Sequence, residues 1–288
     1  MNGKIIDGKY YADKILTDLY DKVKKINKDL SIVPTLAIIL VGNDSASLVY
    51  INNKIKAAKK ININAFKIIF DENVALDEVL ANIMKLNDDK NISGIIVQLP
   101  LPKHLNAEIL LSAIHPDKDV DGFHPLNSGK LYSGFTDCFV PATALGCLYL
   151  IKQYISNLSG KNAVIIGRSR IVGRPVAALL LRENCTITIC HSTTNNLSEI
   201  TSRADVIVTA VGKAKSFTEN YFNQNSIIID VGITKDNIDG KLYGDVDFER
   251  VVNNVQYITP VPKGVGPMTV VMLLNNVIDA CVKQHKLT

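Results

Sequence analysis

The sequence predicts an α/β protein made of two domains with a cleft between them. The chain has 288 residues, which exceeds the usual size of a single domain. Amphipathic segments alternate with short apolar runs through both halves, as they do in βαβ units. The composition, with 47% hydrophobic and 21% charged residues, is typical of a globular protein with buried parallel strands.

The first half of the chain contains a series of predicted strand and helix pairs. We expect strands at 35–41, 65–70 and 94–97, and helices at 10–26, 47–61, 76–86 and 106–114. The third strand runs into Gln98-Leu-Pro-Leu-Pro, where the prolines cannot donate to a sheet ladder and so begin a loop. Polar residues at such strand ends lie where α/β sheets bind ligands. The irregular stretch 115–137 is long for a connection, which indicates a functional or interdomain loop.

The second half predicts a Rossmann-like, doubly wound parallel sheet. A helix at 141–155 suits a connector between the domains, and strands follow at 162–166, 186–190, 205–211 and 226–231, with a helix at 175–182. A final helix begins at residue 270 and is expected to pack back on the first domain. We therefore expect one domain at 1–140, completed by residues 270–288, and a second, Rossmann-like domain at 141–269.

The segment 41–54 places a phenol and an amine one helical turn apart. Leu48 and Ile51 belong to the expected buried stripe of this helix, and Tyr50 and Lys54 fall together beside it. An amine at the edge of a buried stripe can lose hydration and then act as a base near neutral pH. The alternative interpretation is a solvated lysine after a packed tyrosine, an arrangement that is common on helices.

The turn at 167–173 resembles a dinucleotide-binding loop in which Ser169 replaces the middle glycine of GxGxxG. Strand, turn and helix N-terminus would present free backbone N–H groups to a phosphate. The end of the following strand carries His191 and Ser192, where a ribose-binding acid would be expected. Arg168 and Ser192 can instead hold a 2′-phosphate, which favours NADP over NAD. An ordinary tight βα turn is the alternative interpretation.

A further glycine follows a later strand on the same carboxyl edge. Gly232 and Ile233 come directly after the predicted strand at 226–231. Because glycine has no side chain, the backbone at this point can closely approach a nicotinamide ring.

Three acids, Asp117, Asp119 and Asp121, stand within five residues. A divalent-metal loop is one interpretation, but no Glu closes the loop at the EF-hand spacing, so we expect no metal. A single buried carboxylate can instead accept paired hydrogen bonds from adjacent N–H donors, such as those of a pterin. Turn or capping roles are the simpler interpretation for Asp117 and Asp119.

Composition excludes several other classes of protein. The net charge is only +4 and the lysines are dispersed, which is unlike a nucleic-acid surface. No apolar run approaches the length of a membrane span, and residues 1–4 open no signal-peptide pattern, so we expect a cytoplasmic protein. The five cysteines form no CxxC pair and have apolar surroundings, which predicts reduced core residues.

These motifs occur in the same order as in the bifunctional methylenetetrahydrofolate dehydrogenase/methenyltetrahydrofolate cyclohydrolase family. The resemblance covers essentially the whole chain. The segments that carry it are 41–54, 94–102, 119–123, 167–175, 190–192 and 259–269. The Val-Gln-Leu-Pro-Leu-Pro motif at 97–102 and the Gly-Arg-Ser turn at 167–169 are far more specific than a generic glycine loop.

The resemblance implies oxidation of 5,10-methylenetetrahydrofolate with NADP, followed by hydrolysis of the methenyl product to 10-formyltetrahydrofolate. It also implies that 1–140 with 270–288 is a folate-binding catalytic domain, and that 141–269 is an NADP-binding domain through which a homodimer forms. The implied role is in one-carbon metabolism and purine biosynthesis. The implied catalytic residues are Lys54, Tyr50, Gln98 and Asp121. Those that bind the folate are Tyr50, Lys54, Gln98, Leu99, Asp121, Pro262 and Gly266. Those that bind the cofactor are Gly167, Arg168, Ser169, Ile171, Gly173, Pro175, His191, Ser192, Gly232 and Ile233.

The sequence departs from the family pattern at a few positions. Ala142 and Ala144 stand where relatives commonly have Cys and Pro, and Lys263 stands where they have Gly. Thr193 replaces an Arg that follows His-Ser in many relatives, which weakens the expected grip on the 2′-phosphate.

Three alternative functions remain open at this stage. A monofunctional cyclohydrolase would keep the folate residues, and a silent folate-binding or nucleotide-binding module would bind without turnover. A short-chain dehydrogenase also uses Tyr-x-x-x-Lys, but there the glycine loop precedes the Tyr/Lys pair, whereas here the pair comes first.

Overall fold

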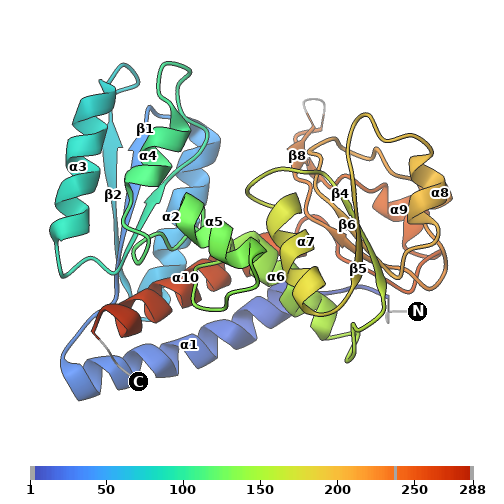
Figure 1. Cartoon of the computed structure of the whole chain (residues 1–288), viewed down its shortest axis with the longest axis horizontal. Helices are drawn as coiled ribbons and strands as arrows, with labels where there is room; N and C mark the ends of the chain where they lie inside the picture. The colour runs from blue at the N-terminus through green and yellow to red at the C-terminus, as the bar shows by residue number, and fades with distance from the viewer. Residues whose placement is uncertain (1–3, 237–238, 286–288) are drawn as a thin grey trace. The chain divides into compact units, whose positions relative to one another are not determined.

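The computed structural model describes residues 4–236 and 239–285, which divide into two compact units (Figure 1). Unit 1 contains the described residues up to Asp13 together with Thr143–Thr269. Unit 2 contains Lys14–Ala142 together with the described residues from Val270 onward. The expected functional domains, 1–140 and 141–269, remain a prediction; the compact units differ from these ranges chiefly in placing the first residues with unit 1.

Unit 2 is built on a three-stranded parallel sheet in the order β2-β1-β3 (Figure 1). Its strands are β1 (Thr35–Val41), β2 (Asn64–Phe70) and β3 (Gly94–Val97), and its helices are α2 (Ser45–Lys60), α3 (Leu76–Asp88), α4 (Ala107–Ala113) and α5 (Pro125–Tyr132), with most of α1 (Gly8–Leu30) and α10 (Val265–Gln284). All seven residues of β1 are buried because strands flank it on both sides. β2 and β3 lie on opposite sides of β1, so the carboxyl ends of β1 and β3 form a switch point where α/β sheets bind ligands.

The core of unit 2 joins this sheet to helices α3 and α4. Ile39 of β1 and Val97 of β3 belong to one buried cluster with Val79 and Ile83 of α3 and Leu110 of α4. Each fully buried side chain of this size stabilises the fold by about 1.5–3 kcal/mol. The core therefore fixes the strand ends from which the polar site residues project.

Unit 1 is built on a five-stranded, all-parallel sheet in the order β10-β7-β6-β4-β5. Its main elements are α6 (Ala142–Lys152), β4 (Asn162–Ile166), α7 (Gly173–Arg182), β5 (Thr186–Cys190), α8 (Leu197–Thr201), β6 (Val206–Thr209), β7 (Ile227–Asp230), α9 (Phe248–Val251) and β10 (Tyr257–Ile258). A short 3₁₀ turn (Glu219–Tyr221) and the antiparallel pair β8 (Thr234–Lys235) and β9 (Leu242–Tyr243) complete it. β5 and β6 flank β4 on opposite sides, so the predicted doubly wound sheet is confirmed and its switch point lies at the carboxyl end of β4.

The first described residues belong to unit 1 through backbone hydrogen bonds. The Ile6 amide donates to the carbonyl of Ile258 at 2.9 Å, and the Lys9 amide donates to the carbonyl of Lys263 at 3.0 Å. A Cβ on Gly8 would overlap the Gly264 carbonyl oxygen, so only glycine permits this close approach.

The sequence predicted most regular elements, and it missed the short ones. β1, β3, β4 and β5 have the predicted bounds, since each is a short apolar run between polar turns. Helix α5 lies inside the stretch that we expected to be irregular. It begins at Pro125 behind His124, whose ring nitrogen accepts from the Leu126 amide at 3.0 Å. Because this helix is short and contains serine and glycine, its composition resembles that of a loop.

Helix α10 corrects one expectation about membranes. Among the described residues it is the one helix long and apolar enough to cross a membrane by length and composition, so the expectation that no stretch approaches a span was wrong. However, 61% of its most apolar window is buried inside the protein, as in the core helix of a globular protein. The apolar residues of this helix thus serve as core.

Candidate active site

Helix α2 starts directly at the carboxyl end of β1 and presents Tyr50 and Lys54. Gly42 turns the chain with φ +80°, and the Asp44 carboxylate accepts from the Ser47 amide at 2.8 Å, which caps the helix. That hydrogen bond lowers the pKa of Asp44. Tyr50 and Lys54 lie one helical turn apart, as predicted, and the tyrosine side chain is exposed.

Lys54 meets Gln98 at this strand edge. The Lys54 Nζ donates to Gln98 Oε1 at 3.1 Å. Gln98 follows β3 directly, its backbone N–H donates to the Ile39 carbonyl, and its Nε2 donates to the Leu99 carbonyl at 2.8 Å. Because the amide nitrogen already has an acceptor, the amide oxygen is the atom that faces the amine.

Asp121 is electrostatically coupled to the same amine. Burial raises the pKa of the Asp121 carboxyl to about 6; the Lys54 charge opposes this rise and the Asp119 charge adds to it. Within the described residues, Asp121 accepts no hydrogen bond, so its oxygens remain available to a ligand. Unit 2 thus brings an amine, an amide and a carboxyl group together in one region.

The glycine after Asp121 sets the path of this loop. Gly122 has φ +72°, and a Cβ there would lie 2.7 Å from the Pro141 nitrogen and 2.7 Å from the Val140 carbonyl carbon. Any other residue would push the loop away from the segment before α6. Gly122 therefore fixes the backbone that carries Asp121.

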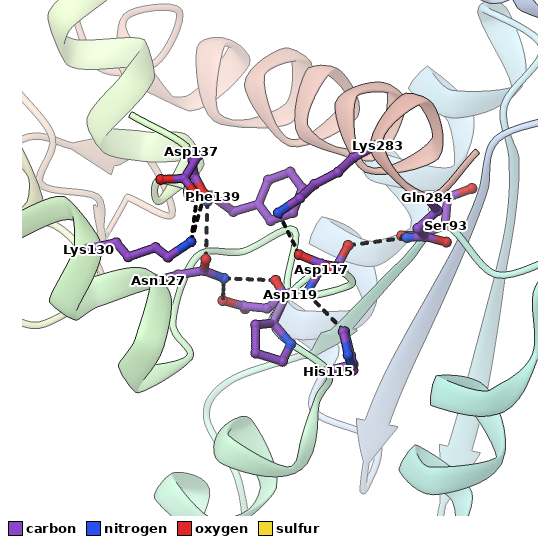
Figure 2. Close-up of polar contacts among 11 residues, drawn as sticks. Ser93, His115, Asp117, Asp119, Asn127, Lys130, Asp137, Phe139, Lys283 and Gln284 are labelled. Carbon is purple, nitrogen blue, oxygen red and sulfur yellow. Dashed lines mark hydrogen bonds and ion pairs between the residues drawn. The ribbon is translucent and has the colours of Figure 1, made fainter. Parts of the chain in front are cut away.

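The other two acids of the loop have structural partners (Figure 2). Asp119 is fully buried and accepts from the amides of Phe123 and His124 and from Asn127 Nδ2, at 3.1, 2.8 and 2.8 Å. Burial raises the pKa of Asp119, and these hydrogen bonds oppose the rise. Of the turn or capping roles expected for these two acids, Asp119 has the turn role, whereas Asp117 binds Lys283 Nζ at 2.5 Å.

A buried lysine ties the loop to helix α3. Lys118 is 6% exposed, and its Nζ donates to the carbonyls of Leu86, Asn87 and Asp89 at 2.9, 2.7 and 2.7 Å. These are carbonyl groups at the C-terminal end of α3, which attract a cation. Burial lowers the pKa of Lys118, and the nearby Asp89 charge opposes that effect.

Helix α10 holds the same loop from the opposite end of the sequence. Asn276 is buried, and its Nδ2 donates to the carbonyls of Val120 and Val140 at 2.8 and 3.0 Å. Figure 2 shows Gln284 reaching Ser93 and Asp117, with Nε2 donating to their carbonyls at 2.7 and 3.2 Å. The residue before Asp121 is therefore anchored by a helix more than 150 positions away.

In unit 1, the predicted dinucleotide turn follows β4. Gly167 has φ +125°, and a Cβ there would overlap the Ala210 carbonyl oxygen; a Cβ on Gly173 would overlap the Gly167 carbonyl oxygen. The Ser169 hydroxyl accepts from the amides of Val172 and Gly173 at 3.2 and 3.3 Å. The serine that replaces the usual middle glycine thus accepts from two backbone amides just before and at the start of α7.

The end of β5 carries two of the residues predicted to bind the cofactor. His191 and Ser192 follow β5, and Thr193 Oγ1 contacts His191 Nδ1 at 2.9 Å, so the threonine engages the histidine ring. Arg168 and Ser192 are both exposed. No carboxylate residue stands at this strand end to repel a 2′-phosphate.

The remaining predicted residues occupy other parts of the structure. Ile171 is exposed in the turn, and Pro175 is buried in the first turn of α7. Pro262 and Gly266 belong to unit 1, where a Cβ on Gly266 would contact Ile233 Cδ1 at 3.8 Å. The roles given to these residues stay predictions.

Sequence reasoning missed two buried acids, Asp230 and Asp245, at the carboxyl edge of the unit 1 sheet. Asp230 ends β7 and accepts from the amides of Gly232, Asp245 and Val246 at 3.1, 3.0 and 2.9 Å, and from Thr209 Oγ1 at 2.9 Å. Burial raises the pKa of Asp230 to about 7, and the Asp245 charge adds to the rise. The sequence feature that could have revealed Asp230 is a carboxylate directly after the apolar run 227–229. A carboxylate in such a position is rarely buried unless it has hydrogen-bond partners.

The geometry of unit 1 fits a dinucleotide cofactor. Among the described residues, the backbone N–H groups of Arg168 and Ser169 donate to no protein acceptor, and they stand in a turn that opens a helix. Glycines occur where the backbone packs too closely for side chains, at Gly167, Gly173 and Gly232. In residues 4–236 and 239–285, no group of three or more His, Cys, Asp or Glu side chains is placed to hold a metal ion.

The cysteines offer no further chemistry in this region. All five are free; Cys147, Cys185, Cys190 and Cys281 are buried and Cys138 is partly exposed. Burial raises the pKa of Cys147 to about 12, which keeps its thiol protonated.

The fold and these two sites define a two-unit α/β enzyme with a nucleotide-binding Rossmann-like unit. Comparison with family models refines this class, because residues 6–121 match the catalytic domain and residues 141–285 match the NAD(P)-binding domain of tetrahydrofolate dehydrogenase/cyclohydrolase. The chain therefore belongs to the tetrahydrofolate dehydrogenase/cyclohydrolase family.

Individual relatives are similar over almost their whole length. The bifunctional protein FolD of Rickettsia typhi is 53% identical over 276 residues, which is 96% of each chain. The bifunctional enzyme FolD-methylenetetrahydrofolate dehydrogenase/cyclohydrolase of Campylobacter jejuni is 43% identical, with a TM-score of 0.94 over 97% of this chain and 98% of that one. The methylenetetrahydrofolate dehydrogenase-cyclohydrolase of Trypanosoma brucei, solved with NADP cofactor and inhibitor, is 33% identical, with a TM-score of 0.93 over 98% of each chain.

Proposed function

We propose that this protein oxidises 5,10-methylenetetrahydrofolate to 5,10-methenyltetrahydrofolate with NADP and hydrolyses the product to 10-formyltetrahydrofolate. The observation that carries the proposal is the hydrogen bond from Lys54 to Gln98, with the half-buried Asp121 carboxyl electrostatically coupled to the same amine. The family membership and the names of the relatives support both activities.

The hydrolysis needs a group that handles a proton, and Lys54 is the residue we assign to it. Water adds to the methenyl carbon, and the amine takes up a water proton as the new C–O bond forms. A proton then moves to the folate nitrogen that leaves the carbon, and the overall reaction consumes one water and releases one proton. Gln98 holds the amine through its amide oxygen at 3.1 Å.

Asp121 and Tyr50 are the residues we assign to folate binding. The Asp121 oxygens can accept hydrogen bonds from adjacent N–H groups of the pterin, since no described protein group donates to them. The Tyr50 ring is 45% exposed, which leaves a face on which the aromatic part of the folate can stack. Leu99, Pro262 and Gly266 complete the proposed folate residues.

The cofactor would be held by the turn after β4 and by neighbouring strand ends. When bound, NADP supplies the hydride acceptor. The turn residues 167–173 offer backbone N–H groups to the phosphates, and Arg168 with Ser192 would bind the 2′-phosphate. Gly232 and Ile233, which follow β7, would lie against the nicotinamide end.

A direct assay tests the two activities together. The purified protein is given methylenetetrahydrofolate and NADP, and NADPH formation is followed beside the decay of added methenyltetrahydrofolate. Both signals are expected. Hydrolysis without NADPH formation would establish a monofunctional cyclohydrolase, and the absence of both would leave a binding module.

We also propose a soluble, cytoplasmic homodimer that acts in one-carbon metabolism and purine biosynthesis without a nucleic-acid or membrane partner. Support for the dimer comes from β5, a strand at the edge of its sheet that pairs with β4 alone among the described residues. Ile189 on this strand is 40% exposed, and an unpaired edge of this kind favours association with a second chain. Light scattering on the purified protein would give the mass of one chain if this part of the proposal fails.

A further inference from the structure

Asp245 lies between two loops at the carboxyl edge of the unit 1 sheet. Asp245 is fully buried. Its Oδ2 accepts from the Val211 amide at 2.6 Å, and its Oδ1 accepts from the Lys213 amide at 2.8 Å. The carboxylate therefore fixes the turn that follows β6, in which Gly212 has φ +67°.

The Asp245 carboxylate also packs against the turn that follows β7. A Cβ on Gly232 would overlap Asp245 Oδ1, so the glycine backbone packs directly on this oxygen. The Gly232 amide in turn donates to Asp230 Oδ1 at 3.1 Å, and the Asp245 amide donates to the same oxygen at 3.0 Å. A second glycine, Gly244, gives Asp230 the matching space, since a Cβ there would overlap Asp230 Oδ2.

We propose that Asp245 is a positioning residue of the cofactor site, whose buried carboxylate holds the turn at 211–213 and sets the position of Gly232. Two loops from different strands are held by one group, and Gly232 is a residue to which we assign the nicotinamide end of the cofactor. The inference rests on the proposed function of this site.

The chemistry of the carboxylate explains why an amide cannot replace it. Both oxygens accept from backbone N–H groups, so in either orientation of an Asn side chain its NH₂ would face an N–H donor. One loop must then move. In the wild type, the three backbone N–H groups of Val211, Gly212 and Lys213 oppose the rise that burial causes in the pKa of Asp245.

The two activities of the proposed enzyme allow a test of Asp245→Asn in the full-length protein. Dehydrogenase turnover needs the cofactor, whereas hydrolysis of methenyltetrahydrofolate can be measured without it. We expect the Kd for NADPH, measured by its fluorescence, to rise about tenfold, the loss expected for one hydrogen bond to a charged group. The KM for NADP should rise in parallel, and hydrolysis without cofactor should keep its wild-type rate.

A matched control is Asp247→Asn, two positions further on. Asp247 makes no side-chain capping bond at the start of α9, so this variant should leave the NADPH affinity unchanged. Equal loss of both activities in Asp245→Asn, or unchanged NADPH affinity, would overturn the inference. A wild-type protein that has neither activity and binds no NADPH would instead refute the proposed function.

A second variant tests the same inference if Asp245→Asn does not fold. Gly232→Ala introduces a methyl group that must displace either the Asp245 carboxylate or the turn after β7. We expect weaker NADPH binding with cofactor-free hydrolysis retained. Wild-type NADPH affinity in this variant would show that the contact between Gly232 and Asp245 does not shape the site.

Discussion

Lys54 Nζ donates to the amide oxygen of Gln98 across 3.1 Å, joining the helix after β1 to the end of β3. The two residues are 44 positions apart in the sequence. They meet because β1 and β3 are neighbouring parallel strands, whose carboxyl ends lie on one edge of the sheet. This contact places a proton-carrying group at the switch point of unit 2.

Replacing Lys54 should separate the two proposed reactions. Lys54→Met keeps most of the side-chain volume and removes the amine. We expect cyclohydrolase turnover to fall by about a hundredfold or more, as for loss of general acid–base catalysis, while dehydrogenase activity survives at a reduced level. NADPH formation and methenyltetrahydrofolate decay are measured on the same sample, with Lys56→Met, an exposed change on the same helix, as the control. Parallel loss of both activities would mean that Lys54 only positions the substrate.

Arg168 should determine the preference for NADP. It is exposed in the turn after β4, and Thr193 offers no charge at the end of β5. We expect Arg168→Ala to raise the KM for NADP by about one to two orders of magnitude, since a charge-assisted contact contributes roughly 1.5–3 kcal/mol. Arg182→Ala, at the other end of α7, serves as the control. If NAD and NADP weaken equally, Arg168 has a structural role.

The Asp121 carboxyl should make stability depend on pH. Its pKa is about 6 in the folded protein and near 3.8 when unfolded, so between these values the folded state binds the extra proton. Wild-type stability therefore declines as pH rises through this window, and Asp121→Asn lacks that decline. The difference in Tm between the variant and the wild type should shift in favour of the variant from pH 4 to pH 6 and then level off. A difference that is constant with pH would contradict the burial of this group.

The same residue should control folate affinity. Since the carboxylate makes its proposed hydrogen bonds in both ground and transition states, Asp121→Ala should weaken folate binding and reduce both activities. Weaker cofactor binding with unchanged folate affinity would show that the loop does not contact the pterin.

Lys263 should be destabilising where it stands. Its φ is +81°, a conformation that disfavours side chains with a Cβ. Lys263→Gly is expected to raise the free energy of unfolding by about 0.5–1 kcal/mol, the relief of strain being partly offset by the greater freedom of glycine in the unfolded chain. Lys263→Ala keeps the Cβ and should show no such gain in denaturant titrations. Equal effects of the two substitutions would point to the amine instead of the backbone.

Asn276 should stabilise the loop that carries Asp121. Asn276→Leu would leave the buried carbonyl groups of Val120 and Val140 without their donor, at a cost of about 2–4 kcal/mol. The KM for folate should rise as well, because Val120 directly precedes Asp121. Asn275→Leu is the matched control, since within residues 4–236 and 239–285 the Asn275 side chain bonds only Asp279 of its own helix. Unfolding by urea, followed by circular dichroism, measures both variants.

Local sequence patterns predicted the longer strands and helix α2, which carries Tyr50 and Lys54, because these depend on nearby residues. The β1 and β4 bounds follow from short apolar runs, and the pairing of Tyr50 with Lys54 follows from the helical repeat. Asp245 could not be found this way, since its partners Val211 and Lys213 stand more than thirty positions earlier. Asp245 meets these partners only in the folded sheet, which brings the turns after β6 and β7 to the same edge as Asp245.

The sequence also did not reveal how the Asp121 loop is anchored, because the anchoring residue is far away in the chain. Asn276 reads as one polar residue in an apolar helix, and its contacts to Val120 and Val140 span more than a hundred positions. The family resemblance implied folate-site roles for Lys54 and Asp121, and these roles stay proposals. The contacts that hold helix α2 and the Asp121 loop came from the structure.

The backbone bonds from Ile6 to Ile258 and from Lys9 to Lys263 have a consequence for protein synthesis. Ile6 and Lys9 are synthesised well before their partners Ile258 and Lys263. Unit 1 therefore cannot be completed until the ribosome has passed residue 263, whereas the last strand of the unit 2 sheet ends at Val97 and is made much earlier. A chain whose synthesis stops between residues 97 and 258 would contain all three strands of the β2-β1-β3 sheet but would lack the partners of Ile6 and Lys9.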